Sequence, residues 1–355
     1  MKVLITGICG FVGSSVAESL LERRHGVEIW GIDNFIRPGS ELNRPRLEKS
    51  GVRVVHGDIR AASDFESLPA VDWVIDAAAN PSVLAGVQGG FSSRQLFEHN
   101  LASLVNVLEF SKMHRAGCML LSTSRVYSIP ALLGLPLRVC GSAFELDASG
   151  PLPEGVSTEG LGVDFSTRPP ISLYGSTKLA SEAVALEFGE AFNFPVWINR
   201  CGVLGGAGQF GRPDQGIVAY WIHAHQRGNR LRYIGFDGTG KQTRDVFHPR
   251  DLTALLLAQM ETGRSGGQRV YTAGGGKSNA FSLTGLTAWC DARFRPLQPE
   301  ADLRPRPFDV PWVVMDSSDA RRDFGWRPET SMSCIFEQIA IHAENHPDWL
   351  ERSGL

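Results

Sequence analysis

Two residues suited to proton transfer lie four positions apart in the segment Tyr174-Gly-Ser-Thr-Lys178. In a helix, this spacing puts the phenol and the ammonium group on one face. A free phenol has a pKa of about 10 and is a poor base at neutral pH, but a nearby positive charge favours the phenolate and lowers that pKa. The pattern therefore predicts a tyrosine base assisted by a lysine. A helix start with a surface lysine gives the same spacing, so the pattern alone leaves both interpretations open.

A run of hydroxyl side chains, Ser122-Thr123-Ser124, follows an apolar segment and precedes Val126-Tyr127. If the apolar segment is a strand of a parallel sheet, these hydroxyls lie at the carboxyl edge of the sheet, where cofactors and substrates bind. Small hydroxyl residues also cap strand ends without any role in chemistry. The run is thus a candidate part of a catalytic site.

A glycine-rich loop with Gly7, Gly10 and Gly13 directly follows the first apolar run and opens a helix-like segment. Such glycines permit a tight turn, close approach of the backbone to a pyrophosphate, and close packing of helix on strand. Asp33, twenty residues beyond Gly13, is placed to accept hydrogen bonds from the adenosine ribose. Because its carboxylate would repel a ribose phosphate, the pattern predicts NAD in preference to NADP. Asp58-Ile59 is a candidate contact to adenine, although a Gly-Asp pair also occurs in ordinary turns.

Short apolar runs that alternate with amphipathic segments must position these residues. Such alternation is typical of a parallel sheet with crossover helices. We therefore expect an α/β fold, a Rossmann-type doubly wound parallel sheet with a smaller C-terminal substrate lobe. The predicted strands are Lys2–Thr6, Val27–Asp33, Val52–His56, Trp73–Ala77, Met119–Thr123, Pro195–Arg200 and Arg269–Thr272. A helix-like segment covers Phe11–Arg24, and the segments with the clearest helical periodicity are Leu96–His114 and Leu173–Phe192.

The domain boundaries follow from where this alternation decays. We expect residues 1–200 and 236–277 to form the NAD-binding domain, and residues 201–235 and 278–355 to form the substrate-binding lobe. The segment from Tyr127 to Tyr174 is rich in Gly, Pro and Ser and too long for a routine connection, so it is either a functional insertion or a flap.

Composition excludes several classes of protein. With 355 residues, 43% of them hydrophobic, and a formal net charge of -3, the chain is neither disordered nor coiled-coil in type. A nucleic-acid-binding protein would need a concentrated basic excess. No apolar run approaches the ~20 residues that span a bilayer. The six cysteines have no CxxC spacing, which favours neither a metal site nor disulfides. We expect a cytoplasmic protein without a nucleic-acid or membrane partner.

Taken together, the motifs resemble the extended short-chain dehydrogenase/reductase family, and within it the nucleotide-sugar epimerases and dehydratases. The resemblance covers nearly the whole chain and includes TGxxGFxG at Thr6–Gly13, GDIR at Gly57–Arg60, DAAA at Asp76–Ala79, the hydroxyl run before Val126-Tyr127, Tyr174 with Lys178, and GKQTRDVFH at Gly240–His248. It implies NAD as cofactor, a nucleotide-diphosphate sugar as substrate and a homodimer. Dehydratases of the family carry an Asp-Glu pair where this chain has Ser124-Arg125. Without that acid pair, elimination of water lacks its proton donor, so an epimerase is favoured.

The resemblance also implies roles for individual residues. Thr123 takes the position of the family hydroxyl three residues before the Val-Tyr pair, so the catalytic set is Thr123, Tyr174 and Lys178. The NAD-binding set lies on the glycine loop, the following strand ends and two helices, and comprises Gly7, Gly10, Phe11, Val12, Gly13, Asp33, Asn34, Asp58, Ile59, Ala77, Ala78, Ala79, Asn100, Tyr174, Lys178 and Arg200. The substrate-binding set comprises Ser124, Arg125, Gln209, Gln215, Arg244, Arg306 and Asp309, in which arginines suit a diphosphate because their guanidinium forks match phosphate geometry.

Within the family, the resemblance is strongest to the CDP-paratose 2-epimerase branch. It is carried by the insertion ending at Val163-Asp164-Phe165, by Ile198–Gly216 and by GKQTRD at Gly240–Asp245. It implies a CDP-sugar whose C2 is inverted through transient oxidation, with the hydride returned to the opposite face. The chain departs from the family pattern at Val83 and Val203, near the expected sugar pocket.

Other reactions of the same fold stay open on this basis. They are 4-epimerisation, decarboxylation or net oxidation of another nucleotide sugar, and, less favoured, a non-catalytic NAD-binding regulator. The helices predicted at Leu96–His114 and Leu173–Phe192 either pair across a two-fold axis or belong only to the core. Cys201 is expected to be a small buried residue and His248 a helix cap, so neither is placed in the catalytic set.

Overall fold

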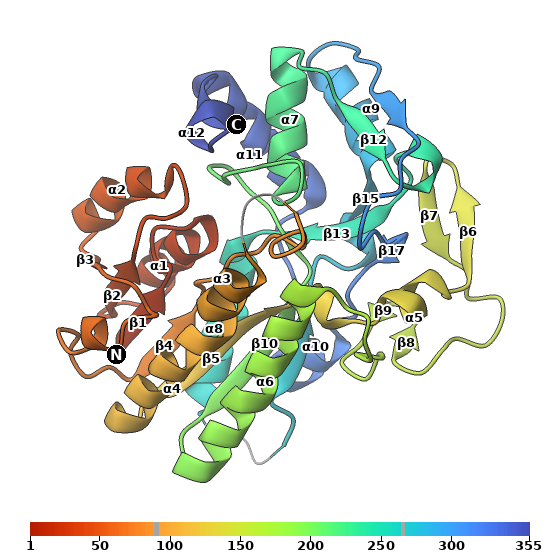
Figure 1. The fold of residues 1–355 in the computed structure, drawn as a ribbon. Coiled ribbons are helices and arrows are strands. Elements are labelled where there is room, and N and C mark those ends of the chain that lie inside the picture. Colours follow the sequence, from red (N-terminus) through yellow and green to blue (C-terminus); the bar gives the residue numbers. More distant parts are fainter. Residues whose placement is uncertain (89–91, 264–266) are drawn as a thin grey trace.

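A seven-stranded parallel sheet forms the centre of the molecule (Figure 1). The computed structural model describes residues 1–88, 92–263 and 267–355. The strand order is β14-β10-β5-β4-β1-β2-β3, and the strands are β1 (Lys2–Thr6), β2 (Glu28–Asp33), β3 (Arg53–His56), β4 (Trp73–Asp76), β5 (Gly117–Thr123), β10 (Val196–Cys201) and β14 (Val270–Ala273). Most are nearly continuous buried apolar runs, as a parallel sheet covered on both faces requires.

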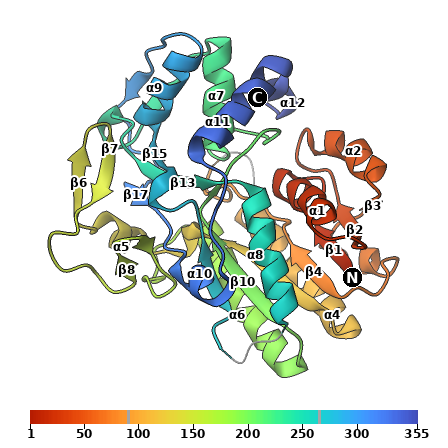
Figure 2. The same cartoon turned by 180° about the vertical axis from the view of Figure 1, so that it is seen from behind.

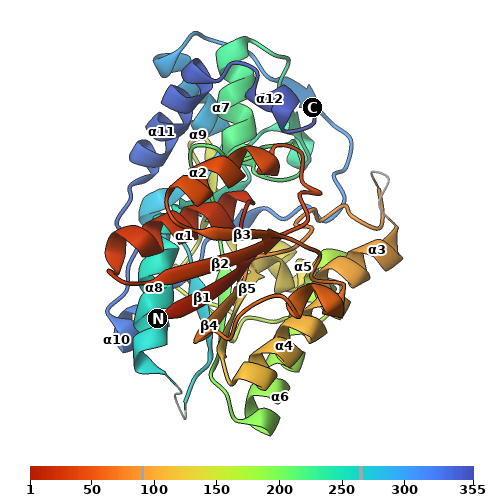
Figure 3. The same cartoon turned by 90° about the vertical axis from the view of Figure 1, so that its left-hand side faces the viewer.

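Helices cover both faces of this sheet. Helices α1 (Phe11–Arg23), α8 (Pro249–Thr262) and α10 (Ser318–Phe324) share one apolar core with it, to which α2 (Arg44–Lys49) adds Leu47. Helices α4 (Ser103–His114) and α6 (Leu173–Phe192) enclose a second core on the other face. Figure 2 views the molecule from behind and shows α8 in front of the sheet. Figure 3 shows the three layers edge-on. The predicted Rossmann-type doubly wound fold is confirmed.

The sheet brings the predicted catalytic and cofactor segments to one edge. Strands β1 and β4 are neighbours, and the strand order runs outward from them in opposite directions. In such a sheet, the connections at the carboxyl ends diverge at this point and leave a crevice for a ligand. Thr6, Asp76, Thr123 and Cys201 end the four adjacent strands β1, β4, β5 and β10.

The second long helix, α6, has the predicted bounds, whereas the first differs. In place of one helix over Leu96–His114, the chain forms α3 (Ser93–Phe97), a π-helical segment (Glu98–Ala102) and α4. Helix α3 begins at a capping box, because the Ser92 hydroxyl accepts from Gln95 N and the Gln95 side chain accepts from Ser92 N. The π-helical segment carries Asn100, which is discussed below.

A second layer of structure lies beyond the carboxyl edge of the sheet (Figure 1). Helices α7 (Ile217–Arg227), α9 (Leu283–Arg293) and α11 (Met332–Asn345) share an apolar core. A small sheet joins them to the centre and comprises β11 (Val203–Leu204), β13 (Thr243–Phe247), β15 (Ala280–Ser282) and β17 (Trp312–Val313). Strand β12 (Arg232–Ile234) pairs with β16 (Glu300–Asp302), and α12 (Trp349–Arg352) is the last helix among the described residues.

The segment from Tyr127 to Tyr174 is an ordered insertion. It forms α5 (Ile129–Leu133), the hairpin of β6 (Leu137–Cys140) and β7 (Ala143–Leu146), and the short pair β8 (Val156–Ser157) and β9 (Gly160–Leu161). Its apolar side chains share a core with residues 310–315. The insertion therefore packs against the second layer and leaves the carboxyl edge of the main sheet accessible.

The domain division predicted from the sequence stays a prediction. Two elements pack with the other part of the molecule from the one that this division predicts. Strand β13 belongs to the small sheet, although residues 236–277 were expected with the NAD-binding domain. Helix α10 contributes Ala320 and Phe324 to the core under the main sheet, although residues 278–355 were expected in the lobe. In the part of the chain that the structure describes, no helix has both the length and the apolar character needed to cross a membrane.

Candidate active site

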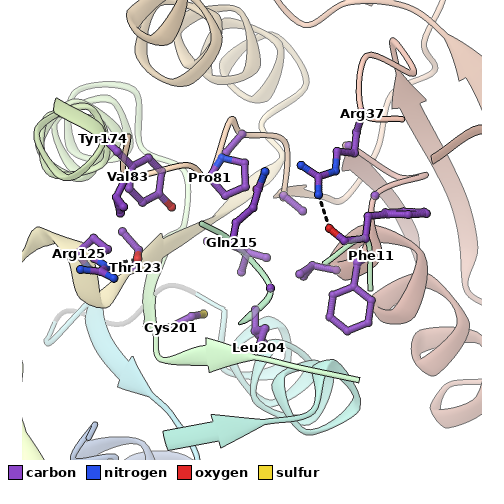
Figure 4. Close-up of a pocket in the computed structure, with 18 of the residues that line it drawn as sticks. Phe11, Arg37, Pro81, Val83, Thr123, Arg125, Tyr174, Cys201, Leu204 and Gln215 are labelled. Atoms are coloured by element: carbon purple, nitrogen blue, oxygen red, sulfur yellow. Dashed lines mark hydrogen bonds between the residues drawn. The ribbon is translucent and has the colours of Figure 1, made fainter. Parts of the chain in front are cut away.

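A pocket opens where the carboxyl edge of the main sheet faces the second layer (Figure 4). Its walls come from the glycine loop, the ends of β2, β4, β5 and β10, the start of α6, and residues 209–217, 242–244 and 306–309. All but two of the predicted site residues lie on these walls. Segments far apart in the sequence thus meet in one cavity.

The glycine loop forms a cradle that side chains would fill. Gly7 has φ +62°, and a Cβ placed on it would lie 2.9 Å from the Ala78 Cα atom. A Cβ on Gly13 would lie 2.3 Å from the Gly7 carbonyl oxygen. The first turn of α1 begins directly after Gly10, so its free N–H groups and the positive end of the helix dipole face the pocket. This arrangement fits a dinucleotide pyrophosphate.

Asp33, at the end of β2, is held by backbone N–H groups of the glycine loop and of the loop that follows β2. One carboxylate oxygen accepts from Cys9 N at 2.9 Å and the other from Phe35 N at 2.8 Å. Burial raises the pKa of Asp33, while these backbone N–H groups act in the opposite direction. Asn34 donates to Asp58 at 2.9 Å, and both line the same wall. The adenosine end of the predicted NAD site is therefore preorganised.

Lys178 is buried between acidic side chains beneath the pocket. Burial lowers its pKa, and the negative charges of Asp76 and Glu182 oppose that effect. Asp76 is itself held by Thr6, whose hydroxyl donates to it at 2.6 Å. The same hydroxyl accepts from Ala77 N and Ala78 N at 3.2 and 3.1 Å. The Thr6 hydroxyl therefore holds Asp76, whose charge acts on Lys178, and the loop after β4 that carries three predicted NAD contacts.

Tyr174 and Thr123, two of the three predicted catalytic residues, lie near one another on the pocket wall (Figure 4). Helix α6 begins just before Tyr174, where the Ser172 hydroxyl accepts from Gly175 N at 3.1 Å. Burial raises the pKa of Tyr174 to about 12, against a hydrogen bond with Thr123 and the positive charge of Arg125, which both lower it. Among the protein's own groups, desolvation therefore outweighs the effects that favour the phenolate.

Three arginines of the pocket wall, Arg125, Arg244 and Arg306, lie close enough for each charge to affect the others. Burial lowers the pKa of Arg244 to about 9, and the positive charges of Arg125 and Arg306 add to this effect. Asp309, with a carboxylate oxygen 3.9 Å from Arg244 Nη2, is the acidic side chain among them. Buried like charges of this kind are costly without a counter-ion. This part of the pocket is therefore suited to an anion with more than one negative charge.

A loop over residues 209–216 covers part of the pocket and is held from both sides. Ser82, after β4, donates its hydroxyl to Asp214 at 2.6 Å. Arg37, after β2, donates to the Phe210 carbonyl group (Figure 4). Arg306 donates to the Pro213 carbonyl group at 3.2 Å. Gln209 and Gln215, the two predicted substrate residues of this loop, both line the pocket.

The structure does not bring two predicted NAD-binding residues to the pocket wall. Arg200 forms a buried ion pair with Glu182 at 2.8 Å and donates to the Val163 carbonyl group at 2.8 Å, which directs it toward α6 and the insertion. Asn100 accepts from Asn80 N at 2.8 Å and donates to the Asn80 carbonyl group at 3.0 Å. Asn100 therefore supports the loop after β4 from behind.

Several residues in or near the pocket are absent from the predicted site sets. Arg37, Asp214 and Gln242 line the pocket, and Glu182 and Asp76 surround Lys178. Glu182 lies four residues after Lys178 on the same helix, so helical spacing alone offered a signal for it. The other residues lie on loops or other elements, and only the folded chain shows which way they point.

The residues set aside from catalysis behave as expected. Burial raises the pKa of the Cys201 thiol to about 12, so it is not a reactive nucleophile. His248 caps α8, because its Nδ1 atom accepts from Arg250 N at 3.1 Å. Within residues 1–88, 92–263 and 267–355, no group of three or more His, Cys, Asp or Glu side chains is arranged to hold a metal ion.

Comparison with known proteins places this site in a family. A family model described as the NAD dependent epimerase/dehydratase family matches residues 3–274. The chain belongs to this family. Its cofactor is NAD, which the glycine cradle and Asp33 fit.

Curated relatives of this epimerase/dehydratase chain act on different sugars. It is 27% identical over 343 residues to CDP-paratose 2-epimerase of Salmonella typhi, covering 93% of this chain and 96% of that protein. It is 28% identical over 354 residues to UDP-glucuronate 4-epimerase 2 of Arabidopsis thaliana, covering 94% and 73%. The fold is shared with the UDP-glucuronic acid 4-epimerase of Bacillus cereus in complex with UDP-glucuronic acid and NAD. That likeness has a TM-score of 0.76 at 24% identity and covers 97% of this chain and 99% of that one.

Proposed function

We propose that the protein is an NAD-dependent nucleotide-sugar epimerase. The observation that supports this best is the single pocket that joins a dinucleotide cradle, the Thr123–Tyr174–Lys178 constellation and a cluster of three arginines. A pure NAD-binding regulator has no need for a buried phenol paired with a hydroxyl, nor for buried guanidinium groups beside them. An enzyme that acts on a diphosphate sugar needs all three parts.

The dinucleotide end of the pocket holds NAD through the glycine loop and Asp33, with Lys178 at the nicotinamide ribose. NAD bound there would supply reversible hydride transfer with a sugar carbon. Thr123 orients the sugar hydroxyl by a hydrogen bond. Tyr174 accepts its proton and gives it back after the sugar has turned in the pocket. Since the phenol is buried and its pKa raised, a positive charge beside it is needed to favour the phenolate at neutral pH.

The arginine cluster holds the diphosphate of the substrate. Arg306 and Arg125 supply charge, and Asp309 keeps Arg244 in place. Gln209 and Gln215 lie in the loop over the pocket, where they can contact sugar and base. Positioning of this kind supplies a large part of catalysis, roughly 7–11 kcal/mol at best.

For the substrate, we infer a CDP-sugar inverted at C2, as in CDP-paratose and CDP-tyvelose. The motifs and the Salmonella typhi relative support this choice. The second candidate is 4-epimerisation of a UDP-uronate, which the Arabidopsis thaliana relatives favour. We further propose a cytoplasmic homodimer that pairs through α3, α4 and α6, where the apolar side chains Phe97, Val105 and Phe192 are exposed.

Incubation of the purified protein with CDP-, UDP-, GDP- and dTDP-sugars, in ordinary and deuterated water, tests the function. Proton NMR identifies the carbon that inverts. We expect inversion without deuterium at that carbon, because the hydride is returned within the pocket. Deuterium at the inverted carbon indicates deprotonation instead, and accumulating NADH indicates net oxidation. Either result contradicts the epimerase cycle.

A further inference from the structure

Arg125 stands apart from the other two arginines because it borders the catalytic pair. Its backbone N donates to the Thr123 hydroxyl at 3.2 Å. A Cβ placed on Gly175, the residue after Tyr174, would lie 2.2 Å from the Arg125 carbonyl oxygen. The backbone of Arg125 is thus wedged between the residue that orients the sugar hydroxyl and the helix turn that carries the base. Figure 4 shows Arg125 and Thr123 on the same side of the Tyr174 ring.

The Arg125 side chain also reaches the part of the pocket that is suited to an anion. Its Nη1 donates to the Phe308 carbonyl group at 3.1 Å, next to Asp309 and two residues from Arg306. That is its one side-chain hydrogen bond among the described residues. Arg244, in contrast, donates to the Thr243 and Val310 carbonyl groups at 2.7 and 2.8 Å and lies beside Asp309. Arg125 therefore keeps most of its donors for a ligand, whereas Arg244 is held by two backbone carbonyl groups and by Asp309.

The reacting hydroxyl and an anion must then lie close together in the substrate. We propose that Arg125 is a specificity-determining residue that binds an anionic oxygen group carried on the sugar carbon next to the carbon that reacts. The inference rests on the proposed epimerase function and narrows its substrates.

Sugar chemistry offers two positions that meet this condition. C2 neighbours C1, which carries the diphosphate. C4 neighbours C5, which carries a carboxylate in a uronate. C4 of a neutral hexose has no anionic group on either neighbour. The protein should therefore invert C2 of a nucleotide sugar or C4 of a nucleotide-linked uronate, and should not accept UDP-glucose as a 4-epimerisation substrate.

Binding measurements on the NAD-loaded protein test this, using Arg125→Met, Arg125→Lys and the control Arg304→Met. Arg304 lies in the same segment as Arg306, is exposed and is paired with Asp302, so its replacement should change nothing. CDP, UDP and UDP-glucuronate are titrated by calorimetry. If Arg125 takes the diphosphate, Arg125→Met weakens CDP and UDP binding roughly 10–100-fold. If it takes the sugar carboxylate, UDP binding is unchanged and UDP-glucuronate binding weakens by that factor.

Arg125→Lys keeps the charge without the fork and should lose less affinity in either case. It also provides a folded comparison if the methionine variant unfolds, which a thermal melt reports. The inference is wrong if neither replacement alters binding of any of the three ligands. It is equally wrong if the unaltered protein inverts C4 of UDP-glucose as efficiently as its best substrate with an anionic group next to the reacting carbon. Failure to invert any nucleotide sugar would instead overturn the proposed function, and the binding data would still report on Arg125.

Discussion

At the scale of single residues, the chemistry depends on how strongly the pocket desolvates its polar groups. Tyr174 and Lys178 are both buried, and burial disfavours the charged form of each side chain. It therefore raises the pKa of Tyr174 and lowers the pKa of Lys178. The two acids around Lys178 oppose this for the ammonium group, whereas the phenol has only Thr123 and Arg125. In the proposed mechanism, Tyr174 is therefore the group whose protonation state most affects activity near neutral pH.

Replacement of Tyr174 by Phe should abolish proton transfer while leaving the pocket intact. We expect kcat to fall by about 10²–10⁴-fold, which is the usual contribution of a general base. The NAD content of the purified variant, measured by absorbance after acid release, should stay unchanged. Turnover at the level of the unaltered protein would show that another residue is the base.

The raised pKa of Tyr174 also predicts the direction of the pH profile. In the proposed mechanism the phenolate is the active form, and a group with a pKa of about 12 is mostly protonated at neutral pH. We expect kcat/KM to rise with pH from 7 to 10, and to fall as acid is added. A profile measured in a constant-ionic-strength buffer series checks this. A rate that is flat over this range would contradict the assignment of a protonated resting state.

At the scale of elements, one buried carboxylate joins three segments of the second layer. Asp245 on β13 accepts from Gly276 N at 3.0 Å and from Met315 N at 3.3 Å, and its Oδ1 atom has no partner among the described residues. A Cβ on Gly202 would lie 2.8 Å from that atom. The side chain thus packs behind Gly202 and the end of β10, which border the pocket.

Burial raises the pKa of Asp245 to about 6, so folding favours its protonated form. Its contribution to stability is full below the unfolded pKa of about 4 and is lost as pH rises through 6. We expect the free energy of unfolding to drop by about 1–3 kcal/mol from this group between pH 4 and pH 7. Asp245→Asn should remove that part of the pH dependence, as denaturant titrations of both proteins at the two pH values would reveal. Identical pH dependence in both proteins would contradict it.

The exposed apolar faces of α3, α4 and α6 lead to a prediction about assembly. Phe97, Leu101, Val105 and Val184 border a groove there. A charge placed in a buried interface of this kind is strongly unfavourable. If the protein forms the proposed dimer, we expect Val105→Glu to convert it to a monomer in light scattering, with the melting temperature nearly unchanged because Val105 is exposed in the single chain. A dimer of unaltered stability in the variant would place the interface elsewhere.

At the scale of the whole molecule, the pocket is closed by contacts between the main sheet and the second layer. The Ser82–Asp214 hydrogen bond is the clearest, since it links the loop after β4 to the loop that carries Gln215. Ser82→Ala removes the donor and leaves the Asp214 carboxylate without it. We expect KM to rise roughly 3–10-fold, with kcat changed less, because one hydrogen bond to a charged group is lost. Steady-state kinetics with Arg304→Met as control would check this, and an unchanged KM would contradict it.

Much of the fold could be predicted from local patterns. The strand positions agree to within one or two residues, and α6 has its predicted bounds, because these are short apolar runs and one long periodic helix. The glycine loop, Asp33, and Tyr174 with Lys178 were recognisable because fixed spacing on one element determines their geometry. The π-helical segment within Leu96–His114 had no such signal, since its residues suit an ordinary helix equally well.

By itself, the sequence determined the doubly wound sheet, the cofactor cradle and the pair Tyr174 and Lys178. Only the tertiary structure decided which side chains meet across elements. It turned Arg200 and Asn100 away from the pocket, brought Arg37 and Asp214 to it, and set Arg125 between the catalytic pair and the arginine cluster. The physical reason is that these side chains lie on segments far apart in the chain. Their direction and their charge environment depend on packing and burial, which no local pattern encodes.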